Sequence, residues 1–535
     1  MKEKDKNGIY NTLFHWQKFR LKLVGEGIAI GILSGLLIVL YRFAVERSSH
    51  ITKELYSKVS QNVGDIILLF IGLVTIAYLV GRMMKEEPMA TGSGIPQVEG
   101  ILLRKMDMNW LNVVVKKFIG GVLALAAGLS LGREGPSVQM GAAIGQGYSR
   151  GFKRVKIEEK FLITSGASAG LAAAFNAPLA GVIFALEEVH KNFSPLVLIS
   201  AMSASLTADF IAKQFFGLKP VFDFHELSAL PLRYYAYLIV LGIIIGIFGV
   251  AFNKALTKTQ DMYASLKWLS VEFRPIIPFI IAGIIGLTNP KLLGGGHELI
   301  MELTKSNFTI AMLLLFLAIK FFFTMISYGS GVPGGIFLPL LVIGALTGNI
   351  YGATLTKIIH IDPKYITNFM ILAMAGYFTA IVKAPITGSI LITEMTGSFT
   401  HLLPLTLVSI TAYIITDVLG SEPIYETLLE RFLHNKGANE FIGDSKKKVL
   451  IESVVTLGSI VAGKKIKDLK WPEKCLLVGV KRGEKELIPK GDTTIYAGDY
   501  IIVLVDEDKA SDITEAISEM SGRCIIEQEL RSKHA

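Results

Sequence analysis

The chain has 535 residues, of which 51% are hydrophobic and only 19% are charged, and its mean hydropathy is +0.50. Soluble domains carry about 25% charged residues, so this composition excludes an ordinary soluble protein and favours a membrane protein. The net charge of +9 indicates membrane topology and not nucleic-acid binding, because no basic-aromatic recognition motif accompanies it.

The N-terminal segment, residues 1–24, is charged and moderately amphipathic and shows no cleavable signal peptide. This pattern predicts a helix that lies against the membrane surface. Its lysines and arginines place it in the cytoplasm by the positive-inside rule. The chain is therefore expected in the cell membrane, with its N-terminus inside.

Residues 25–435 form the predicted transmembrane domain. Apolar runs recur along it, for example at 28–40, 66–80, 237–252 and 310–326, the last interrupted only by Lys320. We count roughly ten to twelve such segments before residue 420, and several of them are short or cut by glycine and proline. This pattern predicts a mainly α-helical, multi-pass protein.

A weak internal repeat relates two halves of this domain. Ala177-Pro178 recurs 207 residues later as Ala384-Pro385, and Glu187 then falls on Glu394. No role follows for Glu394 from its sequence context, and a structural one is favoured. Transporters built from repeats often bind their substrate where the repeats meet, at broken helices near the middle of the membrane.

Three breaks rich in glycine and proline interrupt the apolar runs: "TGSGIPQVEG" (91–100), "GREGPSVQMG" (132–141) and "YGSGVPGGIFLP" (328–339). Each is followed by residues able to begin a helix, and the free N–H groups of a helix N-terminus attract anions. The alternative is helix kinking and close packing by glycine. The GxGxxG within the third break is not a dinucleotide fingerprint, because it follows an apolar membrane run instead of a strand.

The three breaks resemble the motifs of the CLC family of chloride channels and chloride/proton exchangers. GSGIP, GREGP and the GxFxP pattern at 335–339 occur in the family's order, and "FNAPLAGVIFALEE" and "PIYETLLER" match as well. The resemblance implies two inverted repeats with tilted and half-length helices. It also implies a homodimer in the lipid bilayer, with one anion pathway inside each subunit.

The resemblance also assigns candidate residues to the transport site. It makes Glu134 the external gating glutamate, which competes with chloride as a tethered anion. It makes Glu188 the internal proton glutamate of the exchanger branch. It places chloride among Ser93, Tyr425, the backbone N–H groups of Ile336 and Phe337, and the loop formed by Gly132, Arg133 and Gly135.

Each assignment has a simpler alternative. Glu134 could pair with its neighbour Arg133, Ser93 could cap a helix, and Tyr425 could lie at the membrane interface. The pair Glu187-Glu188 could be a solvated helix end.

The sequence predicts a chloride/proton antiporter, with a passive or voltage-gated chloride channel as the main alternative. Glu188 disfavours the channel, because a channel needs no internal proton acceptor. Ser93 disfavours both a fluoride/proton antiporter and a nitrate preference. A cation transporter lacks support, since no TVGYG-type filter occurs. No Ser-His-Asp or metal-ligand spacing stands out among the nine histidines, and no cofactor or enzyme activity is indicated.

The composition becomes polar after about residue 430, which predicts a linker over 436–449 and a small cytoplasmic α/β domain over 450–528. This tail resembles the C-terminal domain of the Trk/RCK regulators of potassium transport. The resemblance implies a dimerising, ligand-sensing domain, with cyclic di-AMP as a candidate ligand and no nucleic-acid polymer as partner. Basic residues that could meet phosphates, or simply form a solvated face, are Lys464, Lys465, Lys481 and Arg482. The two cysteines, Cys475 and Cys524, are too few for a disulfide framework and suit a reducing compartment.

Overall fold

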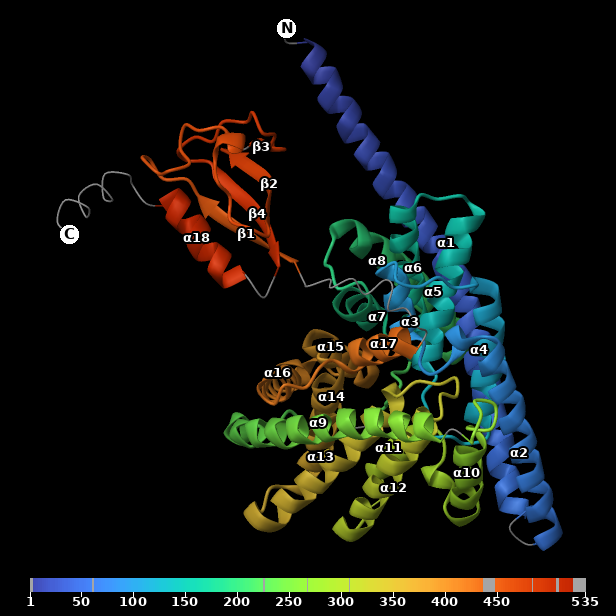
Figure 1. Cartoon of the computed structure of the whole chain (residues 1–535). Coiled ribbons are helices and arrows are strands. Elements are labelled where there is room, and N and C mark those ends of the chain that lie inside the picture. The colour runs from blue at the N-terminus through green and yellow to red at the C-terminus, as the bar shows by residue number, and fades with distance from the viewer. Residues whose placement is uncertain are drawn as a thin grey trace. The chain divides into compact units, whose positions relative to one another are not determined.

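The computed structural model describes residues 3–59, 62–224, 227–266, 268–306, 308–435, 448–483, 485–506 and 510–522. The chain divides into two units, Met1–Leu433 and His434–Ala535, each with its own hydrophobic core (Figure 1). We call them the membrane unit and the tail. Most of the predicted linker lies outside the described residues, and the first strand of the tail begins at Lys448, inside the predicted linker range.

Helices joined by loops form the membrane unit, and among its described residues the only β-pairing is an isolated bridge between Gly132 and Gly335. Its first half contains α1 (Glu3–Val59), α2 (Val63–Glu86), α3 (Ile95–Leu102), α4 (Trp110–Ala126), α5 (Glu134–Gly151), α6 (Lys156–Phe175), α7 (Pro178–Phe184) and α8 (Pro195–Phe216). Its second half contains α9 (Tyr235–Ser265), α10 (Ile276–Thr288), α11 (His297–Leu303), α12 (Ile310–Gly329), α13 (Phe337–Ile359), α14 (Ile366–Val382), α15 (Pro385–Thr396), α16 (Leu402–Val418) and α17 (Ile424–Asn435). Within the described residues, eight helices are long and apolar enough to cross a membrane. The remaining apolar segments of the sequence are shorter helices such as α3, α7 and α11, as expected for half-length elements.

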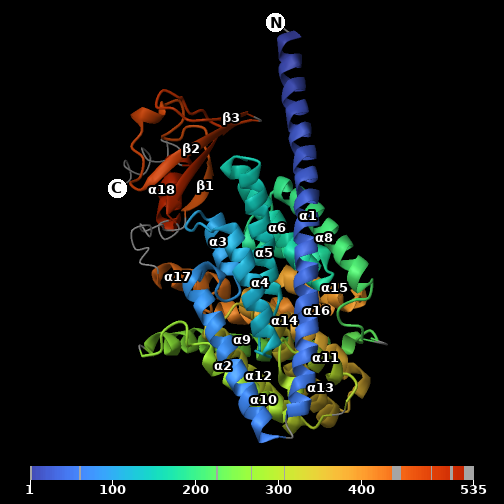
Figure 2. The same cartoon turned by 90° about the vertical axis from the view of Figure 1, so that its right-hand side faces the viewer.

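The N-terminal segment is not a separate helix. Residues 3–24 continue without a break into the first span, so that α1 is one long helix that runs the height of the membrane unit (Figure 2). No proline interrupts residues 3–59, and the glycines in the helix serve close packing instead of a turn. A Cβ on Gly27 or Gly31 would lie within 2.7 Å of backbone carbonyl oxygens of α8.

The backbone confirms the repeat. Asn176 before α7 and Lys383 before α15, 207 residues apart, both adopt the left-handed conformation, with φ of 52° and 64°. Gly94 before α3 and Gly296 before α11 do the same, with φ of 88° and 90°. From the centre of the membrane unit, α5 and α13 extend in opposite directions (Figure 1), as inverted repeats require.

Two fully buried lysines extend this symmetry. Lys117 on α4 donates to carbonyl oxygens of the loop before α3, including that of Gly92 at 2.7 Å. Lys320 on α12 donates to the loop before α11, including the Gly294 carbonyl oxygen at 2.7 Å. A buried ammonium group is unfavourable unless polar groups surround it. Each lysine is therefore surrounded by carbonyls and fixes the loop that supplies them.

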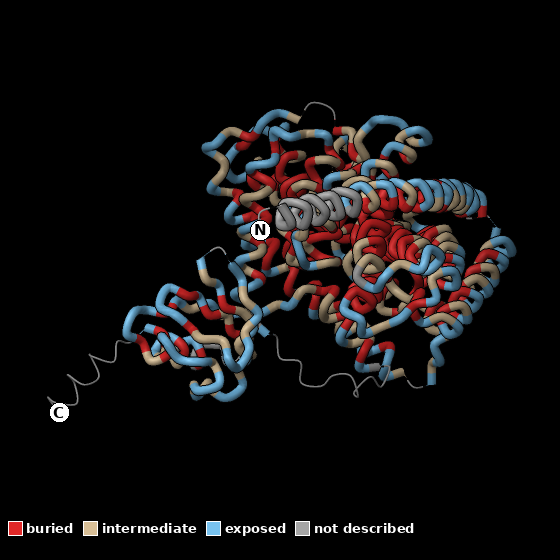
Figure 3. Tube along the Cα trace, turned by 90° about the horizontal axis from the view of Figure 1, so that it is seen from above, coloured by how far each residue is buried: buried red, intermediate tan, exposed pale blue. Residues whose placement is uncertain are grey.

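Buried residues gather in the interior of the membrane unit (Figure 3). The core includes nearly all of α14 and most of α13. Exposed apolar side chains remain on the outer helices, such as Leu206 and Phe210 on α8 and Ile410 and Ile414 on α16. In a soluble protein these would be unfavourable, but they suit a lipid or subunit interface.

The tail is the small α/β domain that the sequence predicts. Its antiparallel sheet has the order β1-β4-β2-β3, formed by β1 (Lys448–Val454), β4 (Tyr500–Asp506), β2 (Cys475–Arg482) and β3 (Lys485–Leu487). Helix α18 (Ala510–Gly522) contributes Ile513 and Ile517 to its core. Cys475 is a half-buried free thiol, whereas Cys524 lies outside the described residues.

Candidate functional site

The three glycine- and proline-rich breaks meet in the interior of the membrane unit. Gly92 of the first break donates to the Gly331 carbonyl oxygen (3.0 Å) and accepts from the Gly334 N–H (2.9 Å). Gly132 of the second break and Gly335 of the third exchange two backbone hydrogen bonds of 2.6 and 2.8 Å. Helices α3, α5 and α13 each begin within three residues of one of these glycines. Their first N–H groups lack intrahelical acceptors, so the junction is suited to an anion.

Glu134 is the first residue of α5 and is fully buried. Its carboxylate oxygens make no hydrogen bond of good geometry among the described residues, but the backbone N–H groups of Glu134 itself and of Leu338, in the first turns of α5 and α13, lie close enough to stabilise its charge. Its Oε2 lies only 2.2 Å from where a Cβ on Gly132 would be. The alternative of an ion pair with Arg133 does not form, because the Arg133 guanidinium pairs with Glu46 on α1 at 2.6 Å. A carboxylate in this position is a functional candidate, since an intramembrane charge is otherwise unfavourable.

Ser93 and Tyr425 are both buried at this junction. The Ser93 hydroxyl oxygen lies 3.4 Å from the Ile95 N–H and 3.4 Å from the hydroxyl of Tyr328. The Tyr425 hydroxyl has no hydrogen-bond partner among the described residues. It lies within electrostatic range of Tyr328 and of both Glu134 and Glu188. A buried hydroxyl without a partner is unfavourable, so Tyr425 is free to donate to an anion.

Tyr328 is a site residue that sequence reasoning missed. It lies in the last turn of α12 and is the first residue of the third break, and its hydroxyl meets the serine of the first break. Its position beside Gly329 was a signal, because residues next to a broken helix tend to line the site that the break creates.

Aromatic packing fixes the start of α13. Ile336 and Phe337 are both fully buried. The Phe337 ring packs against those of Phe175, Phe184 and Phe378, with centroids 5.0, 6.5 and 4.7 Å away. The first N–H groups of α13 are thereby held in place from both halves of the membrane unit.

Glu188 lies in a π-helical turn, Ala185–Val189, at the end of α7. It is only 4% exposed, so the alternative of a solvated helix end is wrong for this residue. Nearby, Lys191 bridges Glu99 on α3, at 2.5 Å, and Glu426 on α17. Glu99 is itself buried. This charged cluster beside Glu188 was not predicted, because it joins residues far apart in the sequence.

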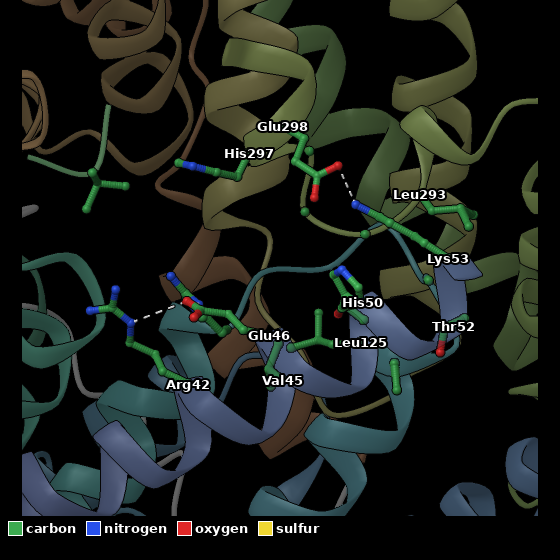
Figure 4. A pocket seen from close by; sticks show the side chains of 18 of the residues that line it. Arg42, Val45, Glu46, His50, Thr52, Lys53, Leu125, Leu293, His297 and Glu298 are labelled. Atoms are coloured by element: carbon green, nitrogen blue, oxygen red, sulfur yellow. Dashed lines mark hydrogen bonds and ion pairs between the residues drawn. The ribbon is translucent and has the colours of Figure 1, made fainter. Parts of the chain in front are cut away.

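A cavity of about 470 Å³ (Figure 4) is lined in part by Arg133 of the GREGP motif. Its walls carry five Lys and Arg side chains but only two Glu: Arg42, Lys53, Arg133, Lys219, Lys291, Glu46 and Glu298. Glu46 and Glu298 are each paired with a cation, Glu298 with Lys53 at 2.5 Å. Lys219 and Lys291 also pair with acids just outside the walls, Asp223 at 3.9 Å and Glu302 at 2.5 Å. The cavity therefore carries only a small excess of positive charge, which favours anions weakly. Arg133 therefore connects this cavity to the motif that contains Glu134.

Known proteins resemble this chain over most of its length. The description "Voltage gated chloride channel" belongs to the family profile that matches residues 72–417, and a TrkA-C domain profile matches residues 450–518. The H(+)/Cl(-) exchange transporter ClcA of Vibrio campbellii is 36% identical over 424 residues, which cover 76% of this chain and 88% of that protein. ClcA of Vibrio cholerae is 37% identical over 453 residues, with coverages of 80% and 93%.

Solved structures give the same picture as the sequence relatives. A slow cyanobacterial Cl⁻/H⁺ antiporter superposes with a TM-score of 0.74 at 31% identity, covering 78% of this chain and 99% of the antiporter. A CLC-type fluoride/proton antiporter, at 23% identity and a TM-score of 0.63 with coverages of 74% and 96%, shares the fold alone. Together with the converging motifs, these matches show that the chain belongs to the voltage-gated chloride channel (CLC) family and has a TrkA-C domain at its C-terminal end.

Proposed function

We propose that this protein exchanges chloride for protons across the cell membrane, with Glu134 as the external gate and Glu188 as the internal proton acceptor. One observation carries the proposal: two buried carboxylates lie within electrostatic range of the same unpartnered hydroxyl, that of Tyr425. The names of the similar transporters, which exchange protons and chloride, support it.

Chloride binds where the three breaks meet. The hydroxyls of Ser93 and Tyr425 donate to it, together with the first N–H groups of α13 at Ile336 and Phe337. Gly132, Arg133 and Gly135 form the neighbouring wall, and a Cβ on Gly135 would lie 2.9 Å from the Ser93 backbone carbonyl oxygen. Donors without formal charge suit a transported anion, because they bind it without trapping it.

Protons couple to chloride through the charge of Glu134. As a carboxylate, Glu134 occupies the anion position at the start of α5 and excludes chloride. A proton neutralises the side chain, which then leaves the helix N-terminus and admits the anion. Glu188 exchanges the same proton with the cytoplasm, so each cycle moves protons one way and chloride the other.

One experiment distinguishes the proposed antiporter from a passive chloride channel. Purified protein in proteoliposomes is given a chloride gradient, and external pH is followed with an electrode. We expect the chloride gradient to drive protons against their own gradient. Chloride flow with a constant pH would replace the antiporter with a passive channel.

We further propose that both termini are cytoplasmic, that the protein is a homodimer, and that the tail regulates transport. The tail's proposed ligand is a dinucleotide such as cyclic di-AMP. Lys464 and Lys481 are the candidate phosphate contacts, together with Lys465, which lies 3.6 Å from Asp492. Arg482 is engaged by Asp499 through two hydrogen bonds of 2.8 Å. Calorimetry with cyclic di-AMP tests the proposed ligand. Deletion of residues 446–535 tests the regulatory role, and it should leave coupled exchange with an altered rate. Loss of transport in a folded, dimeric truncation would contradict the regulatory role.

A further inference from the structure

The adjacent carboxylates Glu187 and Glu188 have different surroundings. Glu187 accepts hydrogen bonds from the backbone N–H groups of Ile386 (3.2 Å) and Thr387 (2.7 Å), and from the Thr387 hydroxyl (2.7 Å). These donors form the first turn of α15, in the other half of the membrane unit. Glu188 Oε1, by contrast, is buried without a hydrogen-bond partner among the described residues, and the side chain lies near Lys191. The π-helical turn that contains both residues is a local feature that is often found at functional sites.

The contact of Glu187 is repeated with the two halves exchanged. Glu394 on α15 accepts hydrogen bonds from the backbone N–H groups of Leu179 (3.2 Å) and Ala180 (2.8 Å), in the first turn of α7. Each carboxylate and each backbone donor of one contact lies 207 residues from its counterpart in the other, and only the Thr387 hydroxyl, whose position corresponds to Ala180 in the repeat, has no equivalent. Helices α7 and α15 are therefore tied to each other by two equivalent carboxylates.

The chemistry of these contacts is that of a helix cap. The first N–H groups of a helix have no intrahelical acceptor, and the helix dipole favours negative charge there. Both helices begin with proline, so their second and third residues supply the free donors. A carboxylate accepts two such bonds at once, and charge-assisted hydrogen bonds are stronger than neutral ones.

The repeat separates the roles of the two glutamates. Glu187 has a counterpart, Glu394, and both make the same structural contact. The position 207 residues after Glu188 is Met395, which is buried and cannot titrate. A carboxylate present in both halves is explained by the scaffold that the halves share. A carboxylate present in one half alone needs a separate explanation, which the proton-acceptor role of Glu188 supplies.

We propose that Glu187 and Glu394 form a reciprocal clamp that positions Glu188 for proton transfer. Glu187 belongs to the same π-helical turn as Glu188 and anchors that turn to α15. Glu394 anchors the start of α7, the helix that leads into the turn. The clamp rests on the proposed function, because it acts through the proton step. It lies outside the chloride site, which is built by α3, α5, α13 and Tyr425.

Glu187→Gln tests the clamp, because glutamine keeps the size of the side chain but loses its charge and one acceptor oxygen. Full-length protein in proteoliposomes is assayed for chloride flux and proton flux in the same vesicles. A small misplacement of a reacting group can slow its reaction about 100-fold. We expect a loss of proton flux of about tenfold with chloride flux largely kept. Glu394→Gln should lower the same ratio. Glu86→Gln, which weakens the ion pairs of an exposed carboxylate on α2 with Arg82 and Lys116, is the matched control.

Thr387→Val provides a milder second test. It removes one donor to Glu187 and leaves both backbone contacts, so the protein should fold even if Glu187→Gln does not. If Thr387 acts through Glu187, the effects of the two substitutions on the proton-to-chloride ratio should not add. Additive effects, or an unchanged ratio in both variants beside a coupled wild type, would overturn the clamp. An equal fall of both fluxes would leave only a structural role. An uncoupled wild type would instead overturn the proposed function itself.

Discussion

Replacing Gly132 by alanine tests whether the Glu134 carboxylate closes the anion pathway. The new Cβ would lie 2.2 Å from Glu134 Oε2. A carbon–oxygen contact is normally about 3.3 Å or longer, so the carboxylate must move by roughly 1 Å. It can do so because it is the free end of a flexible side chain. The new Cβ would also lie 3.1 Å from the backbone nitrogen of Leu338, a tight contact that requires a shift of a few tenths of an ångström at the start of α13. The backbone of Gly132 tolerates alanine, since its φ is not in the left-handed region.

The displacement weakens the interaction of the carboxylate with the N-terminus of α5. Such an interaction is worth up to about 2 kcal/mol in a partly buried site, which corresponds to roughly a 30-fold change in the ratio of closed to open gates. We therefore expect Gly132→Ala to raise chloride flux at neutral pH and to flatten its dependence on pH.

The assay is chloride efflux from proteoliposomes at neutral and acidic pH. Gly151→Ala is the control, because a Cβ at that position of the same helix would meet no atom within 4 Å. Its flux should equal that of the wild type. A folded Gly132→Ala protein with wild-type flux at neutral pH would refute the proposal that this carboxylate position is the closed gate.

Four further predictions follow from the site and the tail. Glu134→Gln should mimic the protonated gate, so that pH-independent chloride flux persists without proton coupling; normal coupling would remove Glu134 from the mechanism. Glu188→Gln should abolish proton flux and spare chloride permeation, and an unchanged proton flux in the same vesicle assay would exclude its relay role. Ser93→Pro should shift selectivity from chloride towards nitrate, because it removes the hydroxyl donor; a constant permeability ratio would indicate that backbone N–H groups dominate. In the tail, the Arg482 guanidinium holds the pKa of Asp499 below its usual range. A depressed carboxyl pKa stabilises the fold above the unfolded value of about 3.9 and loses that contribution as pH falls through the folded pKa. Thermal melts should therefore show a steeper acid destabilisation of the tail in the wild type than in Asp499→Asn, and parallel curves would contradict this assignment.

Local patterns in the sequence were sufficient to locate the main elements of the site. Clusters of glycine and proline favour a break in a helix, because glycine frees the backbone and proline removes a hydrogen-bond donor, whatever surrounds them. The three breaks are therefore visible in the order of the residues, and so are the helix starts after them. The motif resemblance pointed to Glu134, Ser93 and Tyr425, and the structure buries all three at one junction. Their roles in transport stay predictions.

What the sequence alone determined was a helical membrane protein with two related halves, three broken helices and a separate α/β tail. These features depend on composition, periodicity and local backbone preference. Only the tertiary structure decided that Glu187 caps α15 while its neighbour Glu188 lies beside Lys191, and that Tyr328 meets Ser93. The contacts of Glu187 with Thr387 and of Tyr328 with Ser93 join residues 200 and 235 positions apart, and the direction of a side chain such as that of Glu188 depends on how the helix that bears it packs. Neither the long-range contacts nor the side-chain directions can be read from the short-range sequence pattern, because both form only when the two halves of the membrane unit pack together.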